Sequence, residues 1–379
     1  MQPTRRARGR RALVAGCLVL AAVSVPAAAA AAGRPVVVGY VFPRGGPLRQ
    51  GEIAAGKLTH VNYAFAEIRG GRVVDGGPDQ AADLAVLTGA RRDSPGLRVL
   101  VSVGGWLGSK DFSLLARTTS GRARFVASAV AFLHQHDLDG LDVDWEYPGQ
   151  PGAGNPHGPQ DRASFSALLA DLRAAFDREG KARGRSLLLT IAAGASLEYL
   201  EKTDMARAQA SLDLVNLMTY DFLVAESGDK AGHHANLRQH PADPDKRSAD
   251  GVVRAFLAAG VPAQKLVLGV PFYGRAWTGL ASPEDLYRRG RPAKGLDTTY
   301  GGLSKLIGRD GWTRGWDEAA QAPYLWNAAR HTFVTYDDPE SLRLKCRYVR
   351  ELGLAGVMFW DYHGDPTGAL LDALAEGLR

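Results

Sequence analysis

Short apolar runs and longer amphipathic runs alternate along the chain from Gly33 to its carboxyl end. Short runs rich in Val, Ile and aromatic residues predict buried strands, and the longer amphipathic runs predict helices that cover them. The predicted strands are Val36 to Tyr40, Val61 to Ile68, Leu97 to Val103, Gly140 to Tyr147, Leu187 to Ala192, Leu212 to Tyr220, Leu266 to Tyr273 and Gly356 to Tyr362. Predicted helices between them include Arg122 to His136, Ala163 to Phe176, Gly251 to Ala259 and Glu340 to Leu352. This alternation predicts an α/β protein with the TIM (β/α)8 barrel fold.

The alternation breaks once, after the seventh predicted strand. The residues between Tyr273 and Asp338 show no clear strand–helix unit, and this stretch is too long for a structureless loop in a compact domain. Asp338 and Pro339 are the residue types of a helix cap and a first helical position, so the barrel is expected to resume there. We therefore expect residues 275–335 to form a small α+β insertion within a barrel domain that spans 33–379.

Positive charge is concentrated at the amino end. Five of the 46 Lys and Arg residues are arginines within the first eleven positions, which leaves 41 basic residues against 40 acidic ones in the rest of the chain. The formal charge of +6 therefore belongs mostly to one short segment. A nearly neutral remainder argues against a nucleic-acid partner.

Residues 1–32 have the order of a secretory signal peptide: the arginine cluster, an apolar stretch from Ala12 to Val25, and a small-residue run from Ala27 to Ala32. We expect this segment to be removed and the protein to be secreted. The apolar stretch is shorter than the roughly 20 residues that cross a bilayer, so no stable membrane span is expected. Lipoprotein anchoring at Cys17 is a minor alternative, and the paired arginines leave a twin-arginine export route open.

Cysteine and histidine offer little metal chemistry. Cys17 lies in the predicted signal peptide, which leaves Cys346 alone and rules out a disulfide framework or a thiolate zinc site. His233 and His234 have no further histidine nearby with metal-ligand spacing, so we expect them to be solvated or to contact substrate. No cofactor and no metal are predicted, and a monomer is expected.

The most specific local feature is a ladder of carboxylates on one predicted strand. Side chains alternate between the two faces of a strand, so Asp142, Asp144 and Glu146 share one face while Leu141 and Val143 take the other. On a barrel strand the shared face is the interior, where close acids cannot all ionise cheaply and at least one pKa must rise. Glu146 ends the ladder at the carboxyl end of the strand, where barrel enzymes place their chemistry, so it is a candidate general acid.

Two other arrangements also place alternating carboxylates on a strand or in a cluster. An edge strand with an acidic solvent face also alternates Asp with apolar residues, but the apolar face here suits barrel packing. Clustered carboxylates also bind hard divalent cations. We favour acid chemistry over both because of the other segments that accompany the ladder.

Five segments together resemble family 18 of the glycoside hydrolases, the chitinases and their relatives. Asp139 to Glu146 matches the DxxDxDxE signature, Ser102 to Trp106 is similar to the SxGG motif, and Met218 to Phe222 is similar to the MxYD motif. Gly269 to Arg275 and Gly356 to Trp360 resemble the family's seventh and last barrel strands. The predicted insertion resembles the α+β subdomain of bacterial chitinases with a deep substrate groove.

The resemblance implies a retaining mechanism in which the acetamido group of the substrate is the nucleophile. It implies that Glu146 protonates the leaving oxygen and that Asp144 orients the N-acetyl group and stabilises the oxazolinium-like intermediate. Asp142 would hold a proton behind Asp144, and Tyr220 would donate a hydrogen bond to the acetamido oxygen. The residues expected to bind substrate are Tyr40, Phe65, Gly105, Trp106, Met218, Asp221, Tyr273, Arg275 and Trp360.

The resemblance therefore implies a secreted chitinase that hydrolyses β-1,4 bonds between N-acetylglucosamine units, with chitin or its oligosaccharides as partner. Two features depart from the family pattern: Phe222 to Ser227 replaces a tryptophan-containing loop, and Asp361 follows Trp360 where Glu is common. An endo-β-N-acetylglucosaminidase or a peptidoglycan hydrolase on the same fold stays open. A chitin-binding lectin is an alternative from another class, but such proteins typically lack the acid found here at Glu146.

Overall fold

In a computed structural model of the protein, the described residues are Met1, 34–44, 46–228 and 230–379. Residues 34–379 form one compact unit. The predicted signal peptide and Cys17 lie outside the described residues, so secretion, export route and lipoprotein anchoring stay predictions.

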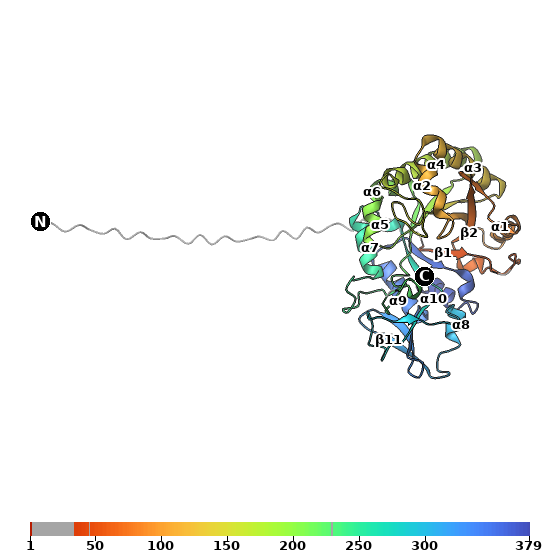
Figure 1. Ribbon diagram of the computed structural model, residues 1–379. Coiled ribbons are helices and arrows are strands. Elements are labelled where there is room, and N and C mark those ends of the chain that lie inside the picture. Colours follow the sequence, from red (N-terminus) through yellow and green to blue (C-terminus); the bar gives the residue numbers. More distant parts are fainter. Residues whose placement is uncertain (2–33, 45, 229) are drawn as a thin grey trace. The chain divides into compact units, whose positions relative to one another are not determined.

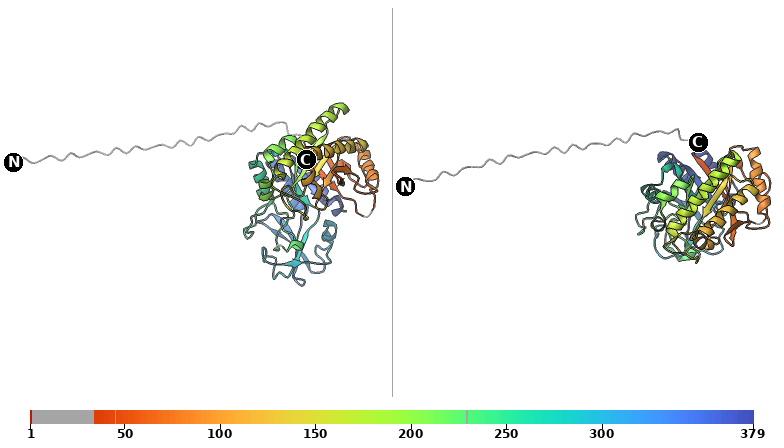
Figure 2. Two further views of the ribbon diagram at one scale, coloured as in Figure 1. Left: turned by 45° about the horizontal axis from the view of Figure 1, so that its top comes forward. Right: turned by 90° about the horizontal axis from the view of Figure 1, so that it is seen from above.

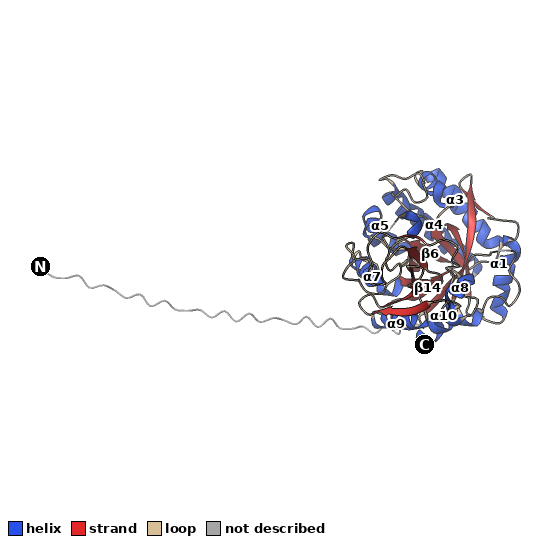
Figure 3. Cartoon of the chain, turned by 60° about the horizontal axis from the view of Figure 1, so that its bottom comes forward, coloured by secondary structure: helices blue, strands red, loops and turns tan. Residues whose placement is uncertain are grey.

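Eight parallel strands of the described chain close into a barrel, in the order β1-β14-β8-β7-β6-β5-β4-β2 with β2 paired back to β1. Figure 3 shows these strands at the centre of a ring of helices. Their bounds are β1 Val36–Val41, β2 His60–Arg69, β4 Arg98–Gly104, β5 Gly140–Asp144, β6 Leu188–Ala193, β7 Leu214–Leu217, β8 Leu266–Pro271 and β14 Gly356–Trp360. A short strand, β3 (Arg72–Val74), extends β2 as an antiparallel hairpin. The predicted TIM barrel is confirmed, although β5 and β7 end earlier than predicted.

Helices surround this barrel (Figure 1). Their bounds are α1 Gln80–Gly89, α2 Phe112–Ala116, α3 Thr119–Gln135, α4 Asp161–Arg183, α5 Leu197–Lys202, α6 Met205–Ala208, α7 Ala249–Ala258, α9 Pro339–Glu351 and α10 Ala369–Gly377. Local sequence explains where several begin: Thr118 and Ser248 cap α3 and α7, and Asp338 forms a capping box with Ser341 ahead of Pro339 in α9. No described helix combines the length and apolar character needed to cross a bilayer.

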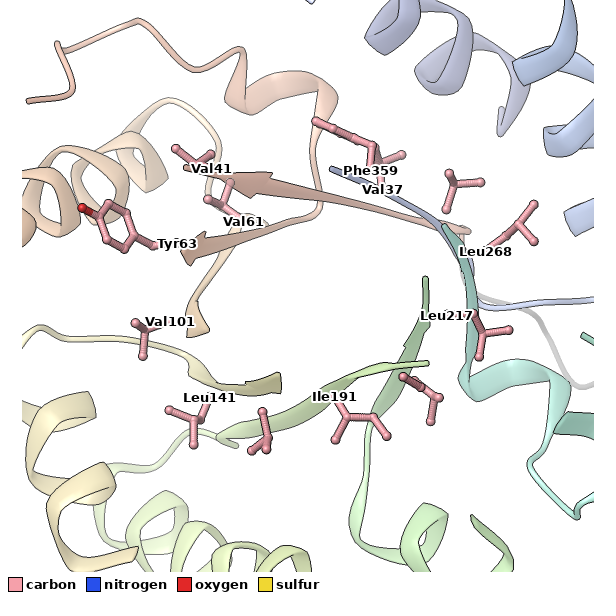
Figure 4. Packing of buried hydrophobic residues seen from close by; sticks show 14 of the residues in the cluster. Val37, Val41, Val61, Tyr63, Val101, Leu141, Ile191, Leu217, Leu268 and Phe359 are labelled. Atoms are coloured by element: carbon pink, nitrogen blue, oxygen red, sulfur yellow. The ribbon is translucent and has the colours of Figure 1, made fainter. Parts of the chain in front are cut away.

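The barrel strands separate two clusters of buried side chains. Their outward residues, such as Val61, Val101 and Leu141, pack toward the surrounding helices and form the main core (Figure 4). Their inward residues form a smaller cluster that includes Val38, Met358 and several aromatic rings. Side chains alternate between inside and outside because a strand has a two-residue period. The barrel interior can therefore hold polar groups at the carboxyl ends of the strands.

Between β8 and α9 the chain forms a second, antiparallel sheet in the order β10-β9-β13-β12-β11, beside the barrel (Figure 1 and Figure 2, left). Its elements are β9 Arg275–Thr278, β10 Arg291–Pro292, α8 Tyr300–Ser304, β11 Trp312–Asp317, β12 Ala322–Asn327 and β13 Thr332–Thr335. Trp277 and Phe333 are fully buried in a separate small core of this region. These elements occupy the stretch where the sequence predicts an insertion with its own strands and helix.

Candidate active site

Asp142 and Asp144 point into the barrel interior at the carboxyl half of β5. Their strand neighbours Leu141 and Val143 lie in the outer core, as the alternation predicts. The register pairs Asp142 with Ser102 on β4 and with Thr190 on β6. Three adjacent strands therefore supply the surroundings of the first ladder carboxylate.

Asp142 is fully buried and surrounded by hydrogen-bond donors. Tyr40 and Ser102 each donate a hydroxyl hydrogen bond of 2.8 Å to Oδ2. Thr190 donates to Oδ1, and the Asn216 side-chain amide donates to the same atom over 3.2 Å. Burial raises the pKa of Asp142, and these hydrogen bonds oppose the rise.

Glu146 lies two residues beyond the end of β5 rather than on the strand, so the predicted strand to Tyr147 is too long. Its backbone is held on both sides. The Glu146 N–H donates to Ser109 Oγ over 2.9 Å, and the Asn155 side-chain amide donates to the Glu146 carbonyl over 3.0 Å. The side chain still reaches the site predicted for it, with the residue only 9% exposed.

The acids of the ladder have raised pKa values. Burial raises the pKa of Glu146 to about 7, a hydrogen bond from Tyr147 opposes the rise, and the charge of Asp221 adds to it. Burial and then the charges of Glu146 and Asp142 raise the pKa of Asp144 well above its usual range. One oxygen of Asp144, Oδ1, is buried without a hydrogen-bond partner among the described residues. The site therefore presents a protonated acid and an unfilled acceptor side by side, which suits proton donation next to an N–H group of a substrate.

A cleft of about 1670 Å³ opens above these carboxylates. Eleven of the thirteen predicted site residues line it, namely Tyr40, Phe65, Trp106, Asp144, Glu146, Met218, Tyr220, Asp221, Tyr273, Arg275 and Trp360. Two predicted residues do not. Asp142 lies beneath the cleft, and Gly105 lies behind the Phe65 ring, where an added Cβ would come within 2.7 Å of that ring.

Aromatic rings form a floor at one end of the cleft. The Trp360 ring is stacked against Phe65 at 5.6 Å and against Phe42 at 5.9 Å between centroids. Trp106 is 51% exposed and meets the edge of Tyr147 at 6.5 Å. Flat rings with one open face cover the C–H side of a sugar ring and leave its hydroxyls free. This floor therefore fits a carbohydrate better than a compact anionic or apolar ligand.

The wall of the cleft contains an ionised acid. Arg275 donates two hydrogen bonds of 2.8 Å to the Asp221 carboxylate, one to each oxygen. Burial by itself would raise the pKa of Asp221, but hydrogen bonds from His234 and Arg275 hold it well below its usual range. Asp221 is thus a fixed negative charge near the protonated Glu146.

The expectation that His233 and His234 are solvated or contact substrate is wrong. Both are buried, and neither lines the cleft. His233 contacts Asp317 over 3.0 Å, and His234 contacts Asp221 over 3.4 Å. Their spacing in the sequence carries no sign of this, because both partners come from distant segments.

Sequence reasoning also missed Thr190, Asn216, Ser109, Asn155 and Tyr147. These residues surround the ladder or hold Glu146 in place. Only the alternation of strands β6 and β7 could have indicated that Thr190 and Asn216 face the interior. The described residues contain no group of three or more His, Cys, Asp or Glu side chains arranged to hold a metal ion.

A (β/α)8 barrel with a glutamic acid of raised pKa just beyond the carboxyl end of a strand, in an aromatic-lined cleft, is the arrangement expected of a glycoside hydrolase. Comparison with known proteins specifies the family. The family described as glycosyl hydrolases family 18 matches residues 36–365. The chain therefore belongs to family 18 of the glycosyl hydrolases.

Individual relatives agree with this assignment. The chain is 35% identical to chitinase A1 of Niallia circulans over 93% of its own length, and it spans about 60% of the length of that relative. Among solved structures, it is 43% identical to a family 18 N-acetylglucosaminidase from Paenibacillus barengoltzii, with a TM-score of 0.83 over 90% of this chain and 99% of the other. A class V chitinase from Nicotiana tobaccum, solved in complex with NAG4, has a TM-score of 0.81 at 27% identity, over 91% of this chain and 99% of the other.

Proposed function

We propose that this protein is a chitinase that hydrolyses β-1,4 bonds between N-acetylglucosamine units by a retaining, substrate-assisted mechanism. The observation that carries the proposal is the Glu146–Asp144 pair: a buried acid with a pKa raised to about 7 beside a carboxylate oxygen without a partner. Both line the cleft whose floor is Trp360. The chitinases similar to this chain support the choice of substrate class.

The first step breaks the glycosidic bond. Glu146 gives its proton to the leaving oxygen, and the carbonyl oxygen of the substrate's own acetamido group attacks the anomeric carbon from the other face. In this step the proton shared by the buried pair lies on Asp142, so Asp144 is the anion. Its Oδ1 accepts the acetamido N–H, which raises the electron density on the acetamido carbonyl oxygen and places a negative charge beside the positive oxazolinium ring. Tyr220, which lines the same cleft, is assigned as the donor that orients the acetamido oxygen.

The second step restores the enzyme. Glu146, now ionised, takes a proton from water as the water oxygen attacks the anomeric carbon and the oxazolinium ring opens. The two inversions return the original configuration. Asp142 is assigned a supporting role, because its four hydrogen-bond donors fix it below Asp144 and let the buried pair share a proton.

The test is mass spectrometry of the products from N-acetylglucosamine hexamer, with peptidoglycan and a high-mannose glycopeptide incubated in parallel. Dimers and trimers from the hexamer support the chitinase proposal. An intact hexamer with a cleaved glycopeptide or peptidoglycan moves the substrate to one of the two alternatives. Binding without cleavage of any of the three favours the lectin alternative.

A second candidate activity is the removal of single terminal units. It is favoured by the similarity to an N-acetylglucosaminidase over nearly all of that protein's length. Monomer as the first product of the hexamer, together with a pentamer, would select this activity over internal cleavage.

We also propose that the mature protein begins after residue 32, that it is secreted, and that residues 275–335 act as a chitinase insertion subdomain. The support is the sequence pattern of 1–32 and the separate sheet formed by β9 to β13. Edman sequencing of the protein recovered from culture medium tests the cleavage site and the location together.

A further inference from the structure

The segment that carries His234 is anchored to the second sheet and to the residue after Asp221. The His234 backbone N–H contacts Thr335 Oγ1 over 3.4 Å, and its carbonyl accepts the Phe222 N–H over 3.0 Å. Thr335 on β13 is the cross-strand partner of Arg275 on β9. One strand pair of the second sheet therefore positions two of the groups that contact the carboxylate of Asp221, Arg275 and His234; Tyr273 is another.

The His234 side chain has one polar contact. It is fully buried, its Nδ1 lies 3.4 Å from Asp221 Oδ1, and its ring lies 5.5 Å from that of Tyr273. Its Nε2 is buried without a hydrogen-bond partner among the described residues. A residue whose only role was to fill space would not leave a ring nitrogen unsatisfied, since an unpaired buried polar atom destabilises the fold. The contact with Asp221 is what distinguishes histidine from an apolar residue here.

The protonation state of this histidine follows from its surroundings. The charged and titratable groups that face it are Asp221, Arg275, Tyr273 and Asp337. Burial lowers the pKa of His234, and the hydrogen bond and charge of Asp221 oppose that shift. The imidazole is therefore neutral at neutral pH. Because Asp221 is an ionised acceptor, the single ring proton lies on Nδ1 and is donated to Oδ1.

The Asp221 carboxylate is held from more than one direction. Its backbone φ angle is +55°, a left-handed conformation that Asp adopts more readily than most other non-glycine residues. Arg275 binds both carboxylate oxygens, and the His234 ring also contacts Oδ1. These contacts restrict the orientation of the carboxylate in the wall of the cleft that Glu146 also lines.

We propose that His234 is a positioning residue: it fixes the ionised carboxylate of Asp221 in the wall of the cleft that the general acid Glu146 also lines. The proposal deepens the proposed function, on which it rests. Burial is the main cause of the raised pKa of Glu146, and the negative charge of Asp221 adds to it. If the His234 hydrogen bond is lost, the Asp221 carboxylate keeps its ion pair with Arg275 but can shift together with that side chain, so Glu146 gives up its proton at lower pH.

The test uses His234→Leu, which removes the N–H donor but keeps most of the volume, and His234→Asn, whose amide nitrogen takes the place of Nδ1. For His234→Leu we expect kcat on a chitin oligosaccharide to fall roughly 10-fold with little change in KM, since the acid is mispositioned rather than the sugar site. The alkaline limb of kcat/KM should move down by roughly half a pH unit. His234→Asn should restore both. If His234→Leu does not fold, His234→Ala takes its place.

His233→Asn is the matched control, because its neighbouring buried ring contacts Asp317 rather than Asp221. It should lower the melting temperature without moving the alkaline limb. A purely structural His234 would behave in the same way: lower stability, an unmoved limb and no rescue by Asn. That result would overturn the proposal.

A readout independent of turnover separates this proposal from the proposed function. The pKa of Glu146 is followed by carbon NMR of a protein labelled at glutamate carboxyls, with the signal assigned by its absence in Glu146→Gln. A lower Glu146 pKa in His234→Leu supports the positioning role whatever the substrate is. An unchanged Glu146 pKa overturns it even if the wild type cleaves chitin oligosaccharides, whereas a wild type that cleaves none overturns only the proposed function.

Discussion

The two ends of strand β5 hold acids in opposite surroundings. Before the strand, Asp137 and Asp139 contact four arginines: Arg91 and Arg185 reach both acids, Arg183 reaches Asp137, and Arg98 reaches Asp139. At the carboxyl end, on the strand and just beyond it, none of Asp142, Asp144 and Glu146 forms an ion pair with another described residue, although all three are buried.

Within a few residues of one strand, the acids at one end contribute to stability and the acids at the other end contribute to chemistry. Paired charges at the amino end of the barrel connect the segment after α1, strand β4, the residues before β5 and the end of α4. Unpaired acids at the carboxyl end keep protons that a cation would remove, and they destabilise the fold when they ionise. A site that destabilises its own fold indicates that function retains it. Each prediction below alters one side of this comparison.

Apart from substitution of Glu146 itself, the largest effect is expected from Asp144→Asn. It removes the negative charge that stabilises the oxazolinium-like intermediate while keeping a group of the same shape, so kcat should fall by roughly 10² to 10³-fold. Initial rates on a chromogenic chitin oligosaccharide measure this, with far-UV circular dichroism as the folding control. A rate within twofold of the wild type would remove Asp144 from the mechanism.

Asp139→Asn tests the opposite end of the strand. Asp139 is 2% exposed and accepts hydrogen bonds from Arg91 over 2.6 Å and from the Val99 N–H over 2.8 Å. Its loss leaves Arg98 without an acidic partner in the described part of the chain, and leaves Arg91 and Arg185 with the exposed Asp137 alone. We expect the free energy of unfolding to fall by about 2 to 4 kcal/mol, with kcat unchanged at a temperature where the variant is folded.

Asp137→Asn is the matched control for that stability measurement. The Asp137 side chain is 63% exposed, so solvent screens its ion pairs, and the loss should stay below about 1 kcal/mol. Urea unfolding of both variants under the same conditions measures the difference. Equal losses at the two positions would show that burial does not decide the strength of these pairs.

The pH profile tests the electrostatics of the carboxyl end without a substitution. Because Glu146 must be protonated to act and its pKa is raised to about 7, kcat/KM should be constant in mildly acidic solution and fall up to tenfold per pH unit above about 7. The opposite slope, with activity rising through pH 7, would contradict a protonated Glu146 as the acid.

The sequence predicted the barrel and the shared face of Asp142 and Asp144 because both rest on local alternation, whereas the insertion was expected where that alternation breaks. Eleven of thirteen predicted site residues line the cleft, and most of them stand at or near the carboxyl ends of predicted strands. Local alternation could not predict that β5 ends at Asp144. It also could not predict that Ser109 and Asn155 hydrogen-bond to the backbone of Glu146 beyond the strand, because those contacts join separate loops.

The histidines show the same limit. Nothing near His234 in the sequence indicates that a segment after β7 packs against Thr335 of the second sheet and so reaches Asp221. Partners of this kind depend on how a long connection folds back over the barrel. They become visible only once the strands of the second sheet have been paired.

The central claim is that Glu146 is the catalytic acid and that its ionisation in the buried site lowers the stability of the fold. The variant Glu146→Gln tests both parts, by its rate of hydrolysis and by its free energy of unfolding. Below pH about 4 the acid is protonated in both folded and unfolded protein. Between pH about 4.5 and about 7 only the unfolded chain ionises it, so the wild type loses stability over this interval and the glutamine variant does not.

We predict that Glu146→Gln loses at least roughly 10³-fold in hydrolysis of a chitin oligosaccharide. At pH 8 it should gain on the order of 1 to 3 kcal/mol in free energy of unfolding, a gain that disappears at pH 4. A variant that hydrolyses at the wild-type rate, or that is less stable than the wild type at pH 8, would contradict the claim.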